Sequence, residues 1–197
     1  MKKTQGGVKA LIIGIILMCL VLGYYYYLSN KKEDVKEETS VTLTAVQEVL
    51  MKNLDSNYPP SPREVLKYYG ELAQCLHNET YSDEEFLQLA VQAQKLYDDE
   101  LIANQTQDQY IQDLQWDINN MKQQEIVISS YTPASSTDVD YFDADGYSWA
   151  KLNLTFTLRQ GTVLNMTEEV FLLRKDEEGH WKIYGWKLAE DVISDEE

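Results

Sequence analysis

The residues most able to do chemistry form an acidic run just before Gly146. The run consists of Asp138, Asp140, Asp143 and Asp145. Carboxylates are the hard oxygen ligands that calcium requires, but the spacing of an EF-hand loop fails. With Gly146 at the invariant glycine position, the first ligand position is Tyr141 and the twelfth is Leu152, and neither side chain is a calcium ligand. We therefore expect a solvated acidic connection and no metal site.

Histidine and cysteine offer little more. His77 and His180 are the only histidines, too few for a convincing zinc site. Cys75 is the only cysteine after residue 39, so no disulfide forms within the body of the chain. His77 follows it by two residues and would point elsewhere on a helix, which favours a buried core cysteine over a reactive thiol. No G-x-S-x-G elbow and no glycine-rich phosphate loop occurs, so we predict no cofactor.

Aromatic side chains are the remaining candidates. Four tryptophans and two tyrosines could line a pocket or pack in a core: Trp116, Trp149, Trp181, Trp186, Tyr68 and Tyr69. Packing in the core is the more common role of such residues. A ligand pocket would combine an aromatic and aliphatic wall with a few polar groups. The first pocket candidates are Tyr69, Trp116, Trp149 and Trp186.

Charge narrows the classes of partner. The chain has 197 residues, of which 44% are apolar and 25% charged, typical of a globular protein with one domain. Residues 40–197 hold 11 Lys or Arg against 29 Asp or Glu, a net charge of −18. Such a surface repels nucleic-acid phosphates and anionic lipid headgroups, so we expect no nucleic-acid partner. A charged protein partner would be basic.

A membrane anchor is predicted near the start. Residues 8–28 are apolar except for Lys9 at the edge, and about 20 such residues span a bilayer as a helix. Lysines flank both ends, and the tyrosine cluster 24–27 is typical of the membrane interface. The alternative is a signal peptide cleaved after Gly23, which the bulky tyrosines disfavour.

The orientation of the anchor follows from its flanks. Three lysines mark the start of the predicted helix, of which Lys9 lies just inside its edge, and three follow it, but acidic residues dilute the second group. We therefore expect residues 1–7 in the cytoplasm and the acidic domain outside. Residues 29–39 read as a charged tether, residues 40–190 as the domain and residues 191–197 as an acidic tail.

Helices are predicted in the first half of the domain. Apolar residues at three- and four-residue spacing indicate an amphipathic helix within 40–55. Ser61, Pro62 and Glu64 form a capping box that begins a second helix, and Ser82 begins a third in the same way. A fourth covers about 107–122. The apolar stripes of the second, third and fourth helices contain Tyr69, Tyr97 and Tyr110 in that order.

Strands are predicted in the second half, where the apolar period changes from 3.6 towards 2. The expected strands are 125–132, about 152–159, about 162–175 and 180–190, with a polar connection over 134–146. In the third strand, Leu164, Met166, Val170 and Leu172 share one face and Phe171 lies on the other. A bulge at Gly185 would bring Trp186 into phase with the rest of the last strand.

This pattern resembles the nuclear transport factor 2-like superfamily over roughly residues 40–190. The resemblance rests on several helices followed by a curved antiparallel meander, and most sharply on the last hairpin, with Gly179-His180-Trp181-Lys182-Ile183 and the later Trp186. It implies an α+β fold in which a sheet of about four strands wraps the helices as a cone whose open end can hold a ligand or an active site. With its anchor, the chain also resembles small bacterial proteins tethered to the membrane by one helix.

Two function classes remain, because a fold does not determine a function. The first is a non-enzymatic, membrane-anchored extracytoplasmic module that binds a small molecule or a protein, or assembles with one. The second is a small-molecule enzyme that uses a carboxylate in the cone as its general base. Glu168 is the candidate base, since it is in phase with Leu164, Met166, Val170 and Leu172; the alternative is that it lies at the rim of the sheet. We favour the binding module, because no catalytic motif of the superfamily can be matched residue by residue.

Overall fold

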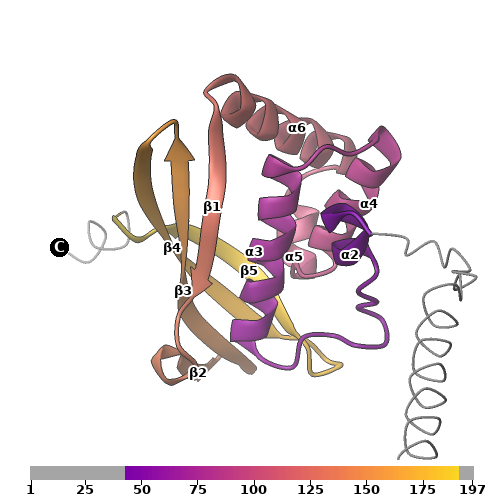
Figure 1. The fold of residues 1–197 in the computed structure, drawn as a ribbon. Coiled ribbons are helices and arrows are strands. Elements are labelled where there is room, and N and C mark those ends of the chain that lie inside the picture. The colour runs from indigo at the N-terminus through magenta and orange to yellow at the C-terminus, as the bar shows by residue number, and fades with distance from the viewer. Residues whose placement is uncertain (1–42, 191–197) are drawn as a thin grey trace, which may run out of the picture. The chain divides into compact units, whose positions relative to one another are not determined.

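The computed structural model describes residues 43–190, which form an α+β domain (Figure 1). Within these residues, five α-helices pack on a curved antiparallel sheet of five strands. The tail 1–7, the membrane helix 8–28, the tether 29–39 and the acidic tail 191–197 that the sequence predicts lie outside the described range. Between residues 43 and 190, no helix is long and apolar enough to cross a membrane.

The first described helix is shorter than its apolar stripe. α2 (Ala45–Leu50) begins after Thr44, whose hydroxyl accepts a hydrogen bond from the Gln47 backbone N–H at 3.2 Å. The Gln47 side chain accepts one from the Thr44 N–H in return, which completes a capping box. The predicted stripe extends to Leu54, but the helix ends at Leu50 and Leu54 reaches the core from the turn that follows.

The predicted start of the second helix, at Ser61 and Pro62, is confirmed. α3 (Pro62–Asn78) begins after Ser61, whose hydroxyl accepts a hydrogen bond from the Glu64 backbone N–H at 3.3 Å. The Glu64 carboxylate pairs with Arg63 at 3.1 Å, and the capping box is left half formed. The helix therefore starts where the sequence predicts, because Pro62 and the Ser61 cap are sufficient.

The remaining helices follow their caps. α4 (Asp83–Gln94) begins with the full capping box between Ser82 and Glu85 that the sequence predicts. α6 (Gln107–Gln123) is confirmed within one residue of its expected end. The sequence analysis missed α5 (Asp99–Ala103), a helix with no buried side chain and hence no apolar stripe to reveal it.

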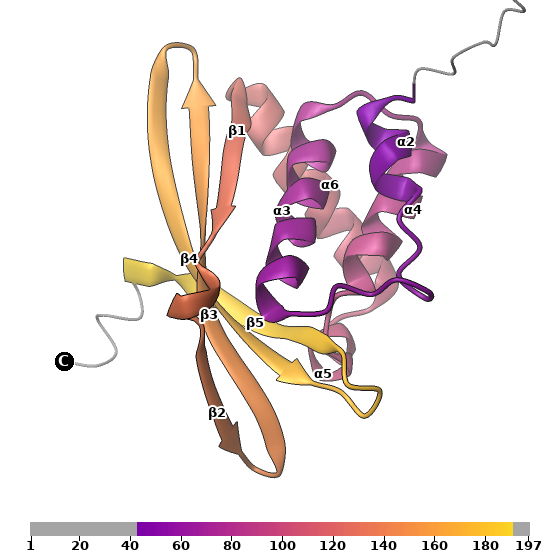
Figure 2. The ribbon, with the colours of Figure 1, turned by 60° about the horizontal axis from the view of Figure 1, so that its bottom comes forward.

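The sheet is antiparallel throughout. Its strands are β1 (Ile126–Pro133), β2 (Asp140–Ala144), β3 (Tyr147–Gln160), β4 (Val163–Lys175) and β5 (Trp181–Leu188). The order is β1-β3-β4-β5, and β2 pairs with the beginning of β3 on the edge where β1 pairs with its end. In both ribbon views the helices gather on one side of the sheet (Figures 1 and 2). We call that side the inner face and the opposite side the outer face.

The prediction of a polar connection over 134–146 is wrong in part. A 3₁₀ turn (Ser136–Asp138) is followed by β2, which forms a hairpin with β3. The hairpin turns at Asp145 and Gly146, whose φ angles are 53° and 82°. Two positive φ angles are what a type I′ turn requires, and Asp-Gly supplies them at low cost. The sequence analysis missed this turn by reading its aspartates as ligand candidates.

The inward face expected for β4, with Leu164, Met166 and Glu168, is the outer face along the first half of the strand. Phe171 and Leu173 are fully buried against the helices, whereas Leu164 is 60% and Met166 78% exposed on the outer face. Phe171 pairs with Leu152 of β3, whose alternate residues face the core. The more apolar face of β4 is therefore the solvated one along its first half.

The core lies between the inner face and α3. Gly70 of α3 packs against the Tyr131 ring of β1 so closely that a Cβ atom there would overlap it.

Strand β5 contains a bulge at the other edge of the sheet. Tyr184 is an extra residue there, between the pairs Leu173–Ile183 and Leu172–Gly185. This confirms the bulge predicted at Gly185, and it turns Trp186 to the inner face, where it stacks on Phe171.

Candidate functional site

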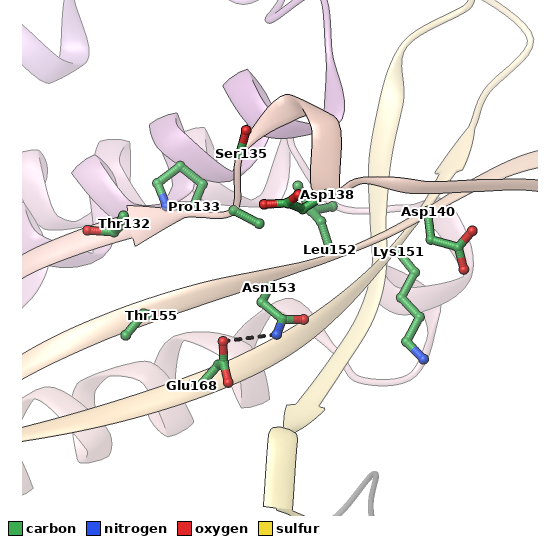
Figure 3. A pocket seen from close by; sticks show the side chains of 11 residues that line it. Thr132, Pro133, Ser135, Asp138, Asp140, Lys151, Leu152, Asn153, Thr155 and Glu168 are labelled. Carbon is green, nitrogen blue, oxygen red and sulfur yellow. Dashed lines mark hydrogen bonds between the residues drawn. The ribbon is translucent and has the colours of Figure 1, made fainter.

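Besides an open and mostly polar hollow of about 460 Å³ beside Tyr58 and Lys95, two hollows of the described domain are large enough to compare. The larger, of about 590 Å³, is an open hollow on the outer face (Figure 3). Polar side chains of β1, β3 and β4 dominate it, and Asn153 donates a hydrogen bond to the Glu168 carboxylate at 2.9 Å. Its wall consists of Thr132, Pro133, Ala134, Ser135, Asp138, Asp140, Lys151, Leu152, Asn153, Thr155 and Glu168. A wall that is open and polar offers little surface on which an organic ligand could be desolvated.

The smaller hollow is a cavity of about 260 Å³ on the inner side of the sheet, which we call the inner cavity. Helices α3, α4, α5 and α6 and strand β5 all contribute to it. It is lined by Tyr69, Leu72, Ala73, Leu76, His77, Ala93, Gln94, Tyr97, Leu101, Ile102, Gln105, Tyr110, Asp113, Leu114, Asp117 and Trp186. An apolar wall with a few convergent polar groups is the usual form of a small-molecule site, so the inner cavity is the better candidate.

Three aromatic rings form one wall of the inner cavity. The Tyr69 ring centroid lies 6.3 Å from that of Tyr97 and 6.0 Å from that of Trp186, and Tyr97 and Trp186 are 5.9 Å apart. Phe171 supports the group from the sheet, with its centroid 5.4 Å from that of Tyr69. We call Tyr69, Tyr97 and Trp186 the aromatic wall. Rings at these distances hold one another in place.

Tyr97 is positioned by a backbone clamp between the end of α4 and β5. The Asp98 N–H donates to the Ile183 carbonyl at 2.8 Å, and the Ile183 N–H donates to the Leu96 carbonyl at 2.8 Å. Arg174 then holds the Asp98 carboxylate through two hydrogen bonds, at 2.6 and 2.9 Å. Asp98 is 4% exposed, so this bidentate pair locks the segment that carries Tyr97 to the sheet.

The tyrosine hydroxyls of the inner cavity are neutral at physiological pH. Burial is the largest cause that raises the pKa of Tyr69, Tyr97 and Tyr110 above the ordinary value. The Tyr97 hydroxyl also interacts with the hydroxyls of the other two. Tyr110 donates a hydrogen bond to the Ala90 carbonyl at 3.1 Å. The hydroxyls can therefore donate to or accept from a ligand without carrying charge.

Glu169 is the most perturbed acid of the domain. It is partly buried on the inner face, opposite Leu154 in the register of β3 and β4. Burial, and then the nearby charge of Asp117, raise the pKa of its carboxyl from 4.5 to about 7. Within residues 43–190 its carboxylate has no hydrogen-bond partner. An acid that changes charge near neutral pH at the edge of a cavity is a functional-site candidate.

His77 of α3 has both ring nitrogens engaged. Nδ1 lies 2.9 Å from the Ala73 carbonyl oxygen, and Nε2 lies 3.0 Å from Oδ2 of Asp117 on α6. Both partners are acceptors when Asp117 is ionised, so both bonds form together when the ring carries two protons. His77 thus ties α3 to α6 beside the inner cavity, and its nitrogens have no free lone pair in that state.

The structure separates the residues predicted to line a pocket. Tyr69 and Trp186 come together in the inner cavity. Trp149 lies elsewhere, beside Tyr141 and Phe142 and edge-on to Tyr184 at 5.0 Å. Trp116 is 69% exposed on α6 and lines neither hollow. The joint pocket expected from these four residues is therefore wrong for Trp149 and Trp116.

The placement predicted for Glu168 is corrected as well. Its side chain is exposed on the outer face, because the face it shares with Leu164 and Met166 points away from the helices. The carboxylate on the inner face of β4 is its neighbour Glu169, which does not line the inner cavity itself but lies near enough to feel the charge of Asp117, and the sequence did not reveal it. Tyr97, Tyr110 and Asp117 were missed too. Two of these were already in predicted apolar stripes, as Tyr97 of the third helix and Tyr110 of the fourth.

The acidic run and the lone cysteine have structural roles. Asp143 accepts a hydrogen bond from the Ser148 hydroxyl at 2.8 Å across the β2–β3 hairpin. In the part of the chain that the structure describes, no three or more His, Cys, Asp or Glu residues are gathered as metal ligands would be. Cys75 is buried, as predicted, and burial raises the pKa of its thiol to about 11.

Comparison with known proteins gives a family and no activity. No curated protein matches the sequence significantly. The model of one family, described as "Domain of unknown function (DUF6715)", matches residues 1–186. The match includes every helix and almost the whole sheet of the described domain. The chain therefore belongs to the DUF6715 family.

Proposed function

We propose that the chain is a membrane-anchored, extracytoplasmic binding module that holds a small molecule in the inner cavity without transforming it. The observation that carries this proposal is the cavity itself: about 260 Å³, bounded by the aromatic wall and supplied with a few polar groups. Ligand pockets have this composition, and the volume suits a small ligand.

The fold supports a relation to the nuclear transport factor 2-like superfamily as part of the same proposal. A curved antiparallel sheet is covered by helices on one face, and a cavity lies between the two layers. The bulge in β5 curls the edge of the sheet towards the helices and brings Trp186 to the cavity. The open end of a superfamily cone can hold a ligand, which is what the resemblance implies for this cavity.

The predicted anchor and the charge support the proposed location. Residues 8–28 have the length and flanks of a membrane helix, and residues 29–39 would hold the domain away from the bilayer. The net charge of −18 over residues 40–197 disfavours close contact with anionic headgroups. The same charge favours a basic or neutral partner over an acidic one.

The state of the usual catalytic side chains favours binding over chemistry. The Cys75 thiol is protonated at neutral pH because burial raises its pKa to about 11, and it does not line the inner cavity. His77 does line the cavity, and its two ring nitrogens contact the Ala73 carbonyl and the Asp117 carboxylate. The Cys75 thiol is therefore a poor nucleophile, and the His77 ring is held by two partners beside the cavity.

Glu169 favours a second candidate function, a small-molecule enzyme. A carboxyl whose pKa is raised to about 7 can accept a proton from a substrate and return it near neutral pH. The tyrosine hydroxyls of the aromatic wall would then stabilise charge that develops on the substrate. This is the enzyme class that the sequence analysis left open, with Glu169 in the role given there to Glu168.

The two functions are separated by what happens to a captured compound. The full chain, held in lipid nanodiscs, is incubated with a mixture of small metabolites, and retained and free compounds are measured by mass spectrometry. The binding module predicts compounds that are retained and recovered unchanged. The enzyme predicts compounds that are converted, with conversion lost in Glu169→Gln and kept in Glu168→Gln.

A matched pair of variants ties retention to the inner cavity. Ala73→Leu fills the cavity from α3, whereas Ala103→Leu adds the same atoms at an exposed position of α5. Ala73→Leu should abolish retention and Ala103→Leu should not. Retention that survives Ala73→Leu, or conversion that depends on Glu169, would overturn the binding proposal.

A further inference from the structure

We propose that the ligand of the inner cavity is a small organic cation, an amine that is protonated at neutral pH and carries a flat apolar body. The inference rests on the proposed binding function and names its ligand class. It follows from three features of the cavity: the sign of its charge, an acid without a hydrogen-bond donor, and the aromatic wall.

The charge of the inner cavity is acidic. Asp113 and Asp117 line it from α6, and Glu169 lies close enough to Asp117 to feel its charge. Among the described residues that line it, no Lys or Arg occurs, and His77 is already paired with Asp117. Three acids against one paired histidine create a negative potential, which a cation relieves and an anion worsens.

The Glu169 carboxylate can accept a hydrogen bond from a ligand. It is partly buried and has no hydrogen-bond partner within residues 43–190. Among the described residues no fully buried polar side-chain atom lacks a partner, so water reaches the Glu169 oxygens, and an ammonium group could replace that water with a charge-assisted hydrogen bond. Its outer-face neighbour Glu168 already accepts a hydrogen bond from Asn153 at 2.9 Å, so of the two acids Glu169 is the one open to a ligand.

The aromatic wall suits the rest of such a ligand. Tyr69, Tyr97 and Trp186 pack with centroids 5.9 to 6.3 Å apart, so a ligand lies against them and not between them. Their faces carry negative potential, which attracts a cation that lies over a ring. Leu101, Ile102 and Leu114 complete an apolar surface for the body of the ligand.

Protonation of Glu169 gives the proposal a signature in pH. The pKa of about 7 means that part of the free protein carries a neutral Glu169 at neutral pH. A bound ammonium favours the ionised form and lowers that pKa, so binding releases protons and the affinity rises as pH passes through 7. A neutral ligand that accepts a hydrogen bond from protonated Glu169 would show the opposite trend.

The test uses two probes that differ in charge and hardly in shape, benzylammonium and benzyl alcohol. Their affinities for the full chain in lipid nanodiscs are measured by calorimetry at pH 6 and pH 8. Benzylammonium should bind about tenfold more tightly than benzyl alcohol at pH 8, and its advantage should shrink at pH 6 and at high salt. Glu169→Gln should remove most of the advantage, and Glu168→Gln, on the outer face, should leave it within about twofold.

Further variants distinguish a failure of the cation proposal from a failure of the binding function. Asp113→Asn changes an exposed acid at the cavity and should weaken benzylammonium by about twofold to threefold, which keeps the test open if Glu169→Gln folds poorly. Equal affinities for the two probes, unchanged by Glu169→Gln but lost in Ala73→Leu, would overturn the cation and leave the binding function standing. No binding of benzylammonium would overturn the cation alone, whereas binding of the probes that survives Ala73→Leu would overturn both.

Discussion

The raised pKa of Glu169 makes the stability of the domain depend on pH in a way that one substitution should remove. The carboxyl has an ordinary pKa of 4.5 and a pKa of about 7 in the folded domain, mainly because it is buried and also because Asp117 is near. The folded state therefore binds the proton more tightly than the unfolded state. Stability contributed by the protonated carboxyl is present at low pH and is lost as pH rises from 4.5 to 7.

The magnitude follows from the size of the rise. A tenfold change in proton affinity is worth about 1.4 kcal/mol, so a pKa that rises from 4.5 to about 7 costs on the order of 3 kcal/mol at pH 8. Part of the cost is already present at pH 5.5, and partial exposure of the side chain screens some of the rest. We expect Glu169→Gln, which is neutral at every pH, to gain about 1 to 2 kcal/mol over the wild type between pH 5.5 and pH 8.

The assay is urea unfolding of residues 40–197, followed by tryptophan fluorescence. Measurements stay above pH 5.5, because the sequence pI is about 4.4 and solubility falls near it. Glu168→Gln is the matched control, an adjacent acid on the outer face, and should change by less than about 0.5 kcal/mol over the same interval. A Glu169→Gln effect that is the same at both pH values would refute the buried position and the raised pKa of this carboxyl.

Three further predictions concern the domain and its location. Phe156→Ala should lower the free energy of unfolding by about 3 to 5 kcal/mol, because the ring is buried on the inner face; a loss under 1 kcal/mol would contradict that position. Arg174→Leu should cost about 3 to 5 kcal/mol because it leaves the buried Asp98 without its cation, whereas Lys95→Ala, which breaks the exposed pair with Asp55, should cost under about 1 kcal/mol. Proteinase added to intact protoplasts that carry the full chain should digest residues 40–197; protection would reverse the proposed orientation, and a mature chain that begins at Tyr24 would replace the anchor with a signal peptide.

The helices were predictable because capping side chains close in sequence determine where each helix starts. Ser61 with Pro62 and Ser82 with Glu85 satisfy backbone N–H groups that a helix leaves open, and each helix begins at the next residue. α5 also has an N-cap, because Asp98 accepts a hydrogen bond from the Glu100 N–H, but the helix is only five residues long and is held by the clamp between Asp98 and β5. A contact between segments so far apart in the chain leaves no periodic trace in the sequence.

The site was harder to predict, because hydrophobicity alone did not identify the covered face of β4. Leu164 and Met166 made the outer face appear to be the core face, and Glu168 was chosen with them. The register contains the missing information: a two-residue turn at Gly161 and Thr162 places Glu169 opposite Leu154, which is on the buried face of β3. The strand register, and not hydrophobicity, identifies Glu169 as the acid on the inner face.

The convergence of Tyr69, Tyr97 and Trp186 could not be read from the sequence in the same way. Tyr69 and Tyr97 belong to the apolar stripes of two predicted helices, but a stripe does not say which sheet residue it meets. Trp186 reaches them because the bulge at Gly185 shifts the facing of β5 by one residue. The bulge was predicted from the sequence, whereas its partners across the cavity depend on how the helices pack.

The central claim is that the inner cavity, and not the larger outer hollow, is the ligand site. The most direct measurement is a map of NMR chemical-shift changes in the full chain as benzylammonium is added. The account predicts that the changes centre on Tyr69, Tyr97 and Trp186 of the inner cavity. Changes centred on Lys151, Asn153 and Glu168 of the outer hollow would contradict it.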